Sequence, residues 1–137
     1  MKSLKITFSI LFISFLSACV STDVYIPNSS DMKNADYGSY PSNYQELVKS
    51  YMQRRLKDPE SAKYRFKGKP IKWYEPSQTL ATTVFNYQLT VFINAKNSYG
   101  GYAGESEYRF SIKNGVITKC SDITEASSGR ISSNWQC

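Results

Sequence analysis

The chain has 137 residues, a formal net charge of +6, and 41% apolar residues. That length suits one domain of ordinary size, and the apolar fraction excludes wholesale disorder. The sequence has no histidine and only three cysteines, none closely spaced, which excludes histidine-based catalytic triads, zinc sites with imidazole ligands, zinc ribbons and iron–sulfur clusters.

The first eighteen residues have the pattern of an export signal. Lys2 and Lys5 precede an apolar run over residues 6–16. This run is too short to span a bilayer, since spanning needs about 20 residues, but it has the length of a signal-peptide core. It ends in the sequence LSAC at 16–19, which resembles the lipobox of bacterial lipoproteins. The alternative is an ordinary cleaved signal in which the cysteine occurs by chance.

The lipobox resemblance implies a signal peptide over residues 1–18 and a mature chain that begins at Cys19. It also implies that Cys19 carries two or three acyl chains, such as palmitate, which anchor a protein stably where a single chain does not. Val20 follows the cysteine, at a position where aspartate commonly retains Gram-negative lipoproteins at the inner membrane. If the source is Gram-negative, we therefore expect a lipid-anchored protein of the outer membrane that faces the periplasm.

A tether and then a helix are expected next. Residues 19–42 comprise the lipidated cysteine and a flexible tether, because the segment is rich in Ser, Asn, Asp, Tyr and Pro without sustained periodicity. A single α+β domain is expected over 43–137. It opens with a helix near Ser42, which has Gln45 at capping-box spacing. The apolar stripe of this helix recurs at helical spacing and consists of Tyr44, Leu47, Val48, Tyr51, Met52 and Leu56.

Strand patterns follow the helix. Apolar and polar side chains alternate most clearly over 85–95, and Asn114-Gly115 predicts a two-residue hairpin turn. The strand-like segments are 62–74 with an interruption at 68–70, 85–95, 108–112 and 116–118. The predicted fold is therefore α+β, with one N-terminal amphipathic helix packed on an antiparallel sheet of about four strands.

The lipobox resemblance also leads to an expectation for the two remaining cysteines. Once lipidation has used Cys19, Cys120 and Cys137 are an even pair in an oxidising compartment. A disulfide between them would contribute about 3 kcal/mol in the loop-entropy model. Two free thiols, or pairing of Cys137 with another chain, are the alternatives, and we expect the internal disulfide.

Basic residues far outnumber acidic ones between Lys49 and Trp73. Such an asymmetry attracts anionic surfaces, such as lipid headgroups, lipopolysaccharide phosphates or peptidoglycan carboxylates. A solvated helix face that continues into an exposed strand explains the same charges equally simply. Nucleic acid is the least favoured partner, because an exported lipoprotein rarely meets it. The strand residues that could contact an anionic partner are Lys63, Arg65 and Lys67.

A loop rich in glycine and tyrosine follows the longest strand, with the sequence NAKNSYGGYAG over 94–104. Glycines permit positive φ, and tyrosines can stack on a ring or a peptide. The loop lacks the GK[ST] of a phosphate-binding loop. A wide bulged hairpin whose tyrosines cover its glycines is the alternative. The candidate binding residues are Lys96, Asn97, Tyr99, Gly100, Gly101 and Tyr102.

Two segments of the chain together resemble a set of small exported bacterial proteins of uncharacterised function. The segments are LKDPESA at 56–62 and NAKNSYGGYAG at 94–104, which match the patterns K-D-P-x-S-A and N-A-K-N-x-[FY]-G-G-Y-x-G. Members often have Cys or Gly just before the second pattern, where this chain has Phe92-Ile93. The resemblance implies a shared fold unit and brings no activity with it.

Enzyme hypotheses have little support in the sequence. Glu105 and Glu107 could imitate the carboxylate pair of a glycosidase, and Lys96 is the lysine nearest the loop, but exposed acids at a strand start are commonplace. We expect a non-enzymatic lipoprotein, without cofactor or metal, that binds a protein partner or an envelope polymer. The alternatives are a structural subunit of a secretion or conjugation complex and an inhibitor or immunity-type lipoprotein.

Overall fold

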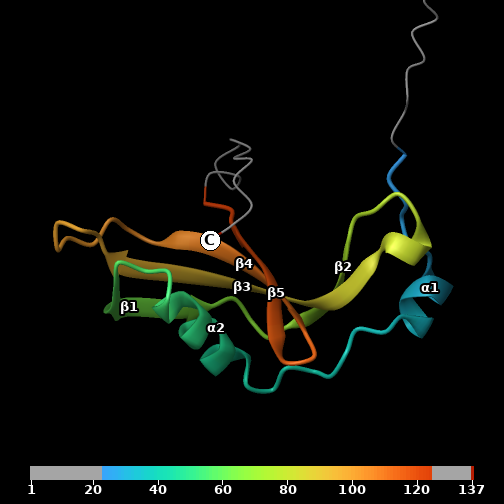
Figure 1. The fold of residues 1–137 in the computed structure, drawn as a ribbon, viewed down its shortest axis with the longest axis horizontal. Helices are drawn as coiled ribbons and strands as arrows, with labels where there is room; N and C mark the ends of the chain where they lie inside the picture. Colours follow the sequence, from blue (N-terminus) through green and yellow to red (C-terminus); the bar gives the residue numbers. More distant parts are fainter. Residues whose placement is uncertain (1–22, 125–136) are drawn as a thin grey trace, which may run out of the picture.

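The fold was obtained as a computed structural model that describes residues 23–124 and Cys137. The expected signal peptide and the expected lipidation site at Cys19 lie outside the described residues. Within them the elements follow in the order α1, α2, β1, β2, η1, β3, β4 and β5 (Figure 1). No helix in this part of the chain is long and apolar enough to cross a membrane.

All five strands belong to one antiparallel sheet. Their bounds are β1 (Asp58–Phe66), β2 (Ile71–Glu75), β3 (Val84–Lys96), β4 (Ser106–Lys113) and β5 (Val116–Asp122). On one edge, β3 pairs with β1 along one half and with β2 along the other. On its other edge β3 pairs with β4, which in turn pairs with β5.

The expected number of about four strands is an undercount. Segment 62–74 forms two strands, because Gly68 turns the chain at φ 77° and Pro70 has no N–H for strand pairing. The first of these strands also begins earlier than expected, at Asp58. The α+β class itself is confirmed.

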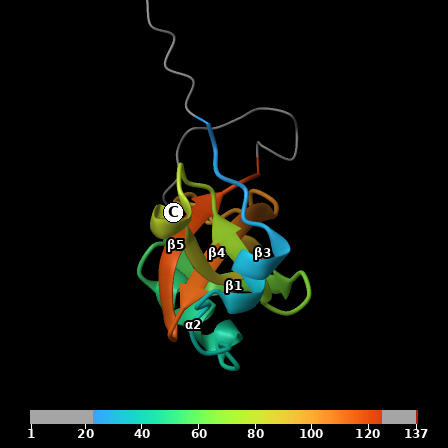
Figure 2. The same ribbon diagram turned by 90° about the vertical axis from the view of Figure 1, so that its right-hand side faces the viewer.

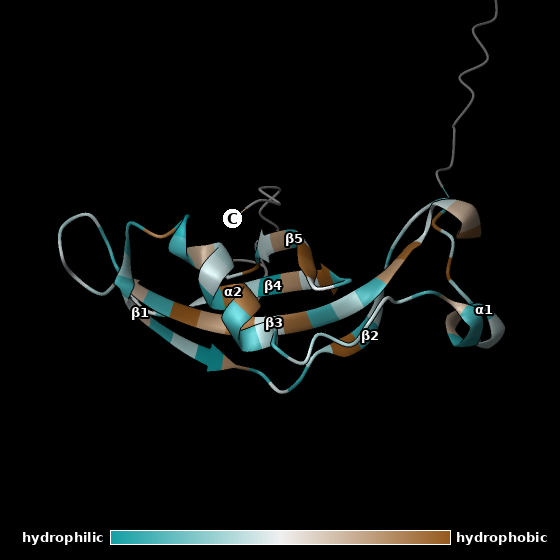
Figure 3. Cartoon of the chain, turned by 60° about the horizontal axis from the view of Figure 1, so that its bottom comes forward, coloured by the Kyte–Doolittle hydropathy of each residue, from teal (hydrophilic) through white to brown (hydrophobic). Residues whose placement is uncertain are grey.

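α2 (Tyr44–Gln53) lies across one face of the sheet, as the end-on view shows (Figure 2). Its buried Val48 and Met52 pack against buried strand residues, and the ring of Tyr51 stands 6.0 Å from that of Phe110. The strand residues of this core are Leu89, Val91, Ile93, Phe110 and Cys120. Apolar and polar bands alternate along β3 (Figure 3), so the same strand presents apolar side chains to α2 and polar side chains to the opposite face.

The capping box expected at the start of this helix is absent. Asn43 occupies the N-cap position and its side chain makes no capping hydrogen bond. Ser42 lies one residue before the N-cap, and its backbone N–H donates to the carbonyl of Tyr40 in the preceding turn.

Residues 23–42 pack on the folded unit instead of forming the flexible tether that their composition predicts. α1 (Ser29–Asn34) begins with a capping box between Asn28 and Asp31. Tyr37 is only 7% exposed, and its ring lies 5.4 Å from that of Phe85. Composition counted the tyrosines of this segment among its polar residues, but Tyr37 packs in the core as an aromatic side chain.

A disulfide joins Cys120 on β5 to Cys137, with their Cα atoms 5.6 Å apart, in agreement with the expected internal pair. Cys120 belongs to the core. The end of the chain is also held from the other side, because Arg55 Nε donates a hydrogen bond to the carbonyl of Cys137 at 3.1 Å. The disulfide therefore fixes Cys137 beside the C-terminal end of α2.

Candidate binding site at the glycine–tyrosine loop

Residues 94–96 of the glycine- and tyrosine-rich segment end β3, so the glycine–tyrosine loop itself comprises residues 97–105. It connects β3 to β4 at one end of the long axis of the molecule (Figure 1). α1 and residue 23 lie at the other end. β3 is 13 residues long, so at about 3.3 Å per residue it separates the two ends by roughly 40 Å.

The two segments that carry the second sequence resemblance meet at this loop. Asp58 pairs with Lys96, and the register of β1 is irregular between Asp58 and Lys63. Inside this irregularity, the hydroxyl of Ser61 donates to the carbonyl of Asp58 at 2.8 Å and accepts the backbone N–H of Lys96 at 2.9 Å. Pro59 suits such a bulge, because it has no N–H to lose from the ladder. Ser61 belongs to the sequence motif but was not among the predicted site residues.

Asn97 fixes the path of the loop. Its side-chain oxygen accepts the backbone N–H groups of Tyr99 at 2.9 Å and Gly101 at 3.2 Å. Its own backbone N–H donates to the carbonyl of Gly101 at 2.9 Å, and Gly100 donates back to its carbonyl at 3.0 Å. Gly100 has φ 79°, a conformation that glycine adopts without strain. The loop is therefore internally hydrogen-bonded rather than loose.

The two tyrosines of the loop have different roles. Tyr102 forms a β-bridge with Lys96, and its hydroxyl donates to the carbonyl of Ser61 at 3.1 Å. Tyr99, in contrast, is 96% exposed. Tyr102 therefore fastens the loop to β1, while Tyr99 projects into solvent.

Two ammonium groups stand over the ring of Tyr102. The Lys63 Nζ is 4.7 Å and the Lys96 Nζ is 5.8 Å from the ring centroid. Cations at these distances are attracted by the negative face of an aromatic ring. The two lysines therefore form a positively charged patch at the base of the loop that carries Tyr99.

Arg65 lies beside this patch but is already paired. Its guanidinium stacks 3.9 Å above the ring of Phe92 and forms an ion pair with Glu105. The hydrogen bond from Arg65 lowers the pKa of Glu105 below its usual range, so this carboxylate stays ionised. An ionised, paired carboxylate does not suit the general-acid role of a glycosidase.

The structure brings most of the predicted residues together and leaves one apart. Lys67 lies just after the end of β1, four residues beyond Lys63 and roughly 13 Å away, where it lines a separate hollow with Lys69 and Ile71. The residues that meet at the loop are Lys63, Lys96, Asn97, Tyr99, Gly100, Gly101 and Tyr102, with Arg65 at the border.

Among the described residues, no group of three or more acidic, histidine or cysteine side chains could hold a metal ion. Comparison with known proteins found no matching family, no matching curated protein and no matching solved structure. Function is therefore inferred from the geometry of the site.

Proposed function

We propose that this chain is a non-enzymatic envelope lipoprotein that binds an acidic partner, a protein or an envelope polymer, through its glycine–tyrosine loop. The observation that carries the proposal is Tyr99, an aromatic side chain 96% exposed on a loop whose backbone is hydrogen-bonded in place. Tyrosine is among the residues that contribute most binding energy at interfaces. A loop that is already ordered loses little conformational entropy on binding.

The positive patch gives the proposed partner its charge. Lys63 and Lys96 stand beside the loop, and within the described residues neither forms a salt bridge. An acidic surface would add Coulomb attraction to the contact with Tyr99 and would accelerate association. Arg65 contributes less, because Glu105 already neutralises it.

The far end of the molecule suits attachment to a membrane. Several exposed apolar residues lie there, close to where the described chain begins, and hydrophobic stretches of the chain are coloured brown at this end in Figure 3. Tyr25 pairs with Ser77, which brings the entering segment beside η1 (Leu80–Thr82). These side chains are Val24, Ile26, Met32, Leu80 and Val84. Cys19 precedes this end by a few residues, so acyl chains on Cys19 would hold the loop roughly 40 Å from the bilayer.

The test is site-specific photo-crosslinking of the full-length protein in cells, with a photoreactive amino acid in place of Tyr99. The matched control carries the same group in place of Val116, which is 62% exposed at the start of β5. We expect a discrete adduct from position 99 and none from position 116. Identical adduct patterns at both positions would refute a binding role for the loop.

The identity of the crosslinked molecule distinguishes the kinds of partner that the protein could bind. One small exported protein would indicate an inhibitor or immunity-type lipoprotein. Several subunits of one assembly would indicate a structural component of a secretion or conjugation complex. An adduct that shifts after digestion with a glycan hydrolase would identify an envelope polymer.

A further inference from the structure

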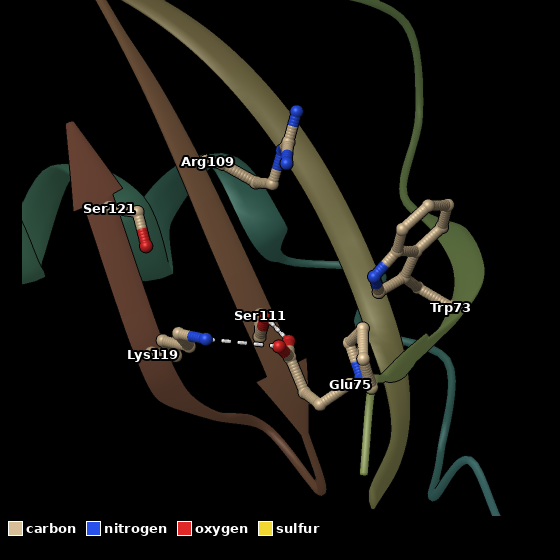
Figure 4. A pocket seen from close by; sticks show the side chains of 7 residues that line it. Trp73, Glu75, Arg109, Ser111, Lys119 and Ser121 are labelled. Carbon is tan, nitrogen blue, oxygen red and sulfur yellow. Dashed lines mark hydrogen bonds and ion pairs between the residues drawn. The ribbon is translucent and has the colours of Figure 1, made fainter. Parts of the chain in front are cut away.

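A second cluster of polar and aromatic side chains lies on the sheet face opposite α2, away from the glycine–tyrosine loop. Arg109 and Ser111 flank the core residue Phe110 on β4, so their side chains point to the other face of the sheet. Together with side chains from β2 and β5 they line a cavity of about 200 Å³ (Figure 4).

Glu75 organises the floor of this cavity. Its carboxylate accepts hydrogen bonds from the Ser111 hydroxyl at 2.7 Å, the Lys119 ammonium at 3.1 Å and the Asn86 amide at 3.3 Å. These donors come from β4, β5 and β3, so the side chain of Glu75 reaches across the sheet from β2. Burial alone would raise the pKa of Glu75, but these hydrogen bonds and the charge of Lys119 outweigh burial and lower it.

The floor is polar and largely buried. Of the lining residues, Ser111 is 3% and Ser121 is 5% exposed. Asn86, which donates to Glu75 from β3 without lining the cavity, is 1% exposed. The side-chain oxygen of Asn86 is buried without a hydrogen-bond partner among the described residues. Buried polar groups in native proteins are usually paired. This patch of polar side chains therefore differs from a sheet face that is merely solvated.

Two groups at the rim remain available to a ligand. Arg109 is exposed, and among the residues that the structure describes it has no acidic partner. Trp73 is 37% exposed and stands across β3 from Arg109, with its indole nitrogen turned toward the cavity (Figure 4). Glu75 and Lys119 offset each other's charge, so Arg109 leaves the cavity with one positive charge in excess.

We propose that this cavity binds a single sugar ring that carries a carboxylate. Its volume is below the 300–1,000 Å³ or so of pockets for drug-sized ligands, which fits one ring. The guanidinium of Arg109 can bind a carboxylate through two parallel hydrogen bonds. The indole of Trp73 offers an apolar face with one donor at its edge. The Glu75 carboxylate and the Ser121 hydroxyl supply an acceptor and a donor for sugar hydroxyl groups.

The probe for this site is glucuronic acid, titrated into the purified full chain and followed by NMR chemical shifts. Arg109→Gln removes the charge at the rim, and Arg54→Gln is the matched control, because Arg54 is exposed at the C-cap of α2, on the other face of the sheet. We expect saturable millimolar binding to the wild type, a dissociation constant at least tenfold higher for Arg109→Gln, and no change for Arg54→Gln. Trp73→Leu should weaken binding to a similar degree.

Several outcomes would overturn the proposal. These are no saturable binding by the wild type, equal effects of Arg109→Gln and Arg54→Gln, or equal affinity for glucose and glucuronic acid. Tighter binding of benzoate than of glucuronic acid would replace the sugar by an aromatic carboxylate and would also refute the proposal. None of these results bears on Tyr99, so the cavity and the glycine–tyrosine loop are tested independently.

Discussion

At the scale of single residues, the two loop tyrosines separate the binding role of the glycine–tyrosine loop from its structural role. Tyr102 is tied to Ser61 through its hydroxyl group and lies under two lysines. Tyr99 is fully presented to solvent while its own backbone N–H is held by Asn97. Substitutions at the two positions should therefore affect different measurable properties.

We expect Tyr99→Ala to weaken partner capture at least tenfold and to leave the melting temperature unchanged, because its side chain is exposed. Tyr102→Phe should instead lower stability by about 1 kcal/mol, since it removes one hydrogen bond. Thermal unfolding and pull-down of the partner, measured on both variants, check this. A melting temperature several degrees lower for Tyr99→Ala, with capture intact, would show that the loop is only scaffold.

Glu75 predicts a second residue-scale effect, on the dependence of stability on pH. Its pKa in the folded protein lies below the ordinary value of 4.5. The carboxylate therefore stabilises the fold above about pH 4.5, and this contribution is lost as the pH falls through the lower, folded-state pKa. Urea unfolding at pH 7 and at pH 3 should show a smaller loss of stability for Glu75→Gln than for the wild type. Equal losses in the two proteins would contradict the prediction.

At the scale of elements, the sequence patterns predicted the helix and the long strand, because each is defined by the spacing of neighbouring apolar residues. The alternation along 85–95 and the helical spacing from Tyr44 to Met52 both report which side chains face the core, and both elements are present. The pairing of both parts of 62–74 with β3 and the docking of residues 23–42 depend on partners distant in sequence. Tyr37, for example, is buried because Phe85, Tyr87 and Lys72 lie against its ring.

The docking of this N-terminal segment is testable through Tyr37. Its ring is 7% exposed against Phe85, so Tyr37→Ala should lower the free energy of unfolding by about 3 kcal/mol, as for other large aromatic side chains in cores. Tyr40 is 47% exposed, and Tyr40→Ala should lower it by less. Chemical denaturation of both variants measures the difference. If neither substitution changed the denaturation midpoint, the segment would not be docked and would instead behave as a flexible tether.

At the scale of the whole molecule, both candidate sites combine segments that are remote in sequence. The glycine–tyrosine loop could be selected from its composition, but the hydrogen bond from Lys96 to Ser61 joins residues 35 apart. The cavity around Glu75 gave no sequence signal, because its residues come from several strands whose order in the sheet was not predicted. Serines and lysines on the polar face of a strand look like solvated residues until those strands are paired.

The orientation of the whole molecule supplies the last prediction. If Cys19 carries the acyl chains, the end of the domain with Val24 and Ile26 rests near the bilayer and the glycine–tyrosine loop points away from it. Cys19→Ala removes the acyl acceptor, so the variant should remain an uncleaved precursor or become soluble. Detergent-phase partitioning and the N-terminal sequence of the product measure this, with Cys120→Ala as the cysteine control that should stay anchored. A Cys19→Ala protein that still partitions into detergent with a mature N-terminus would contradict the lipid anchor, and with it the orientation that presents Tyr99 to a partner.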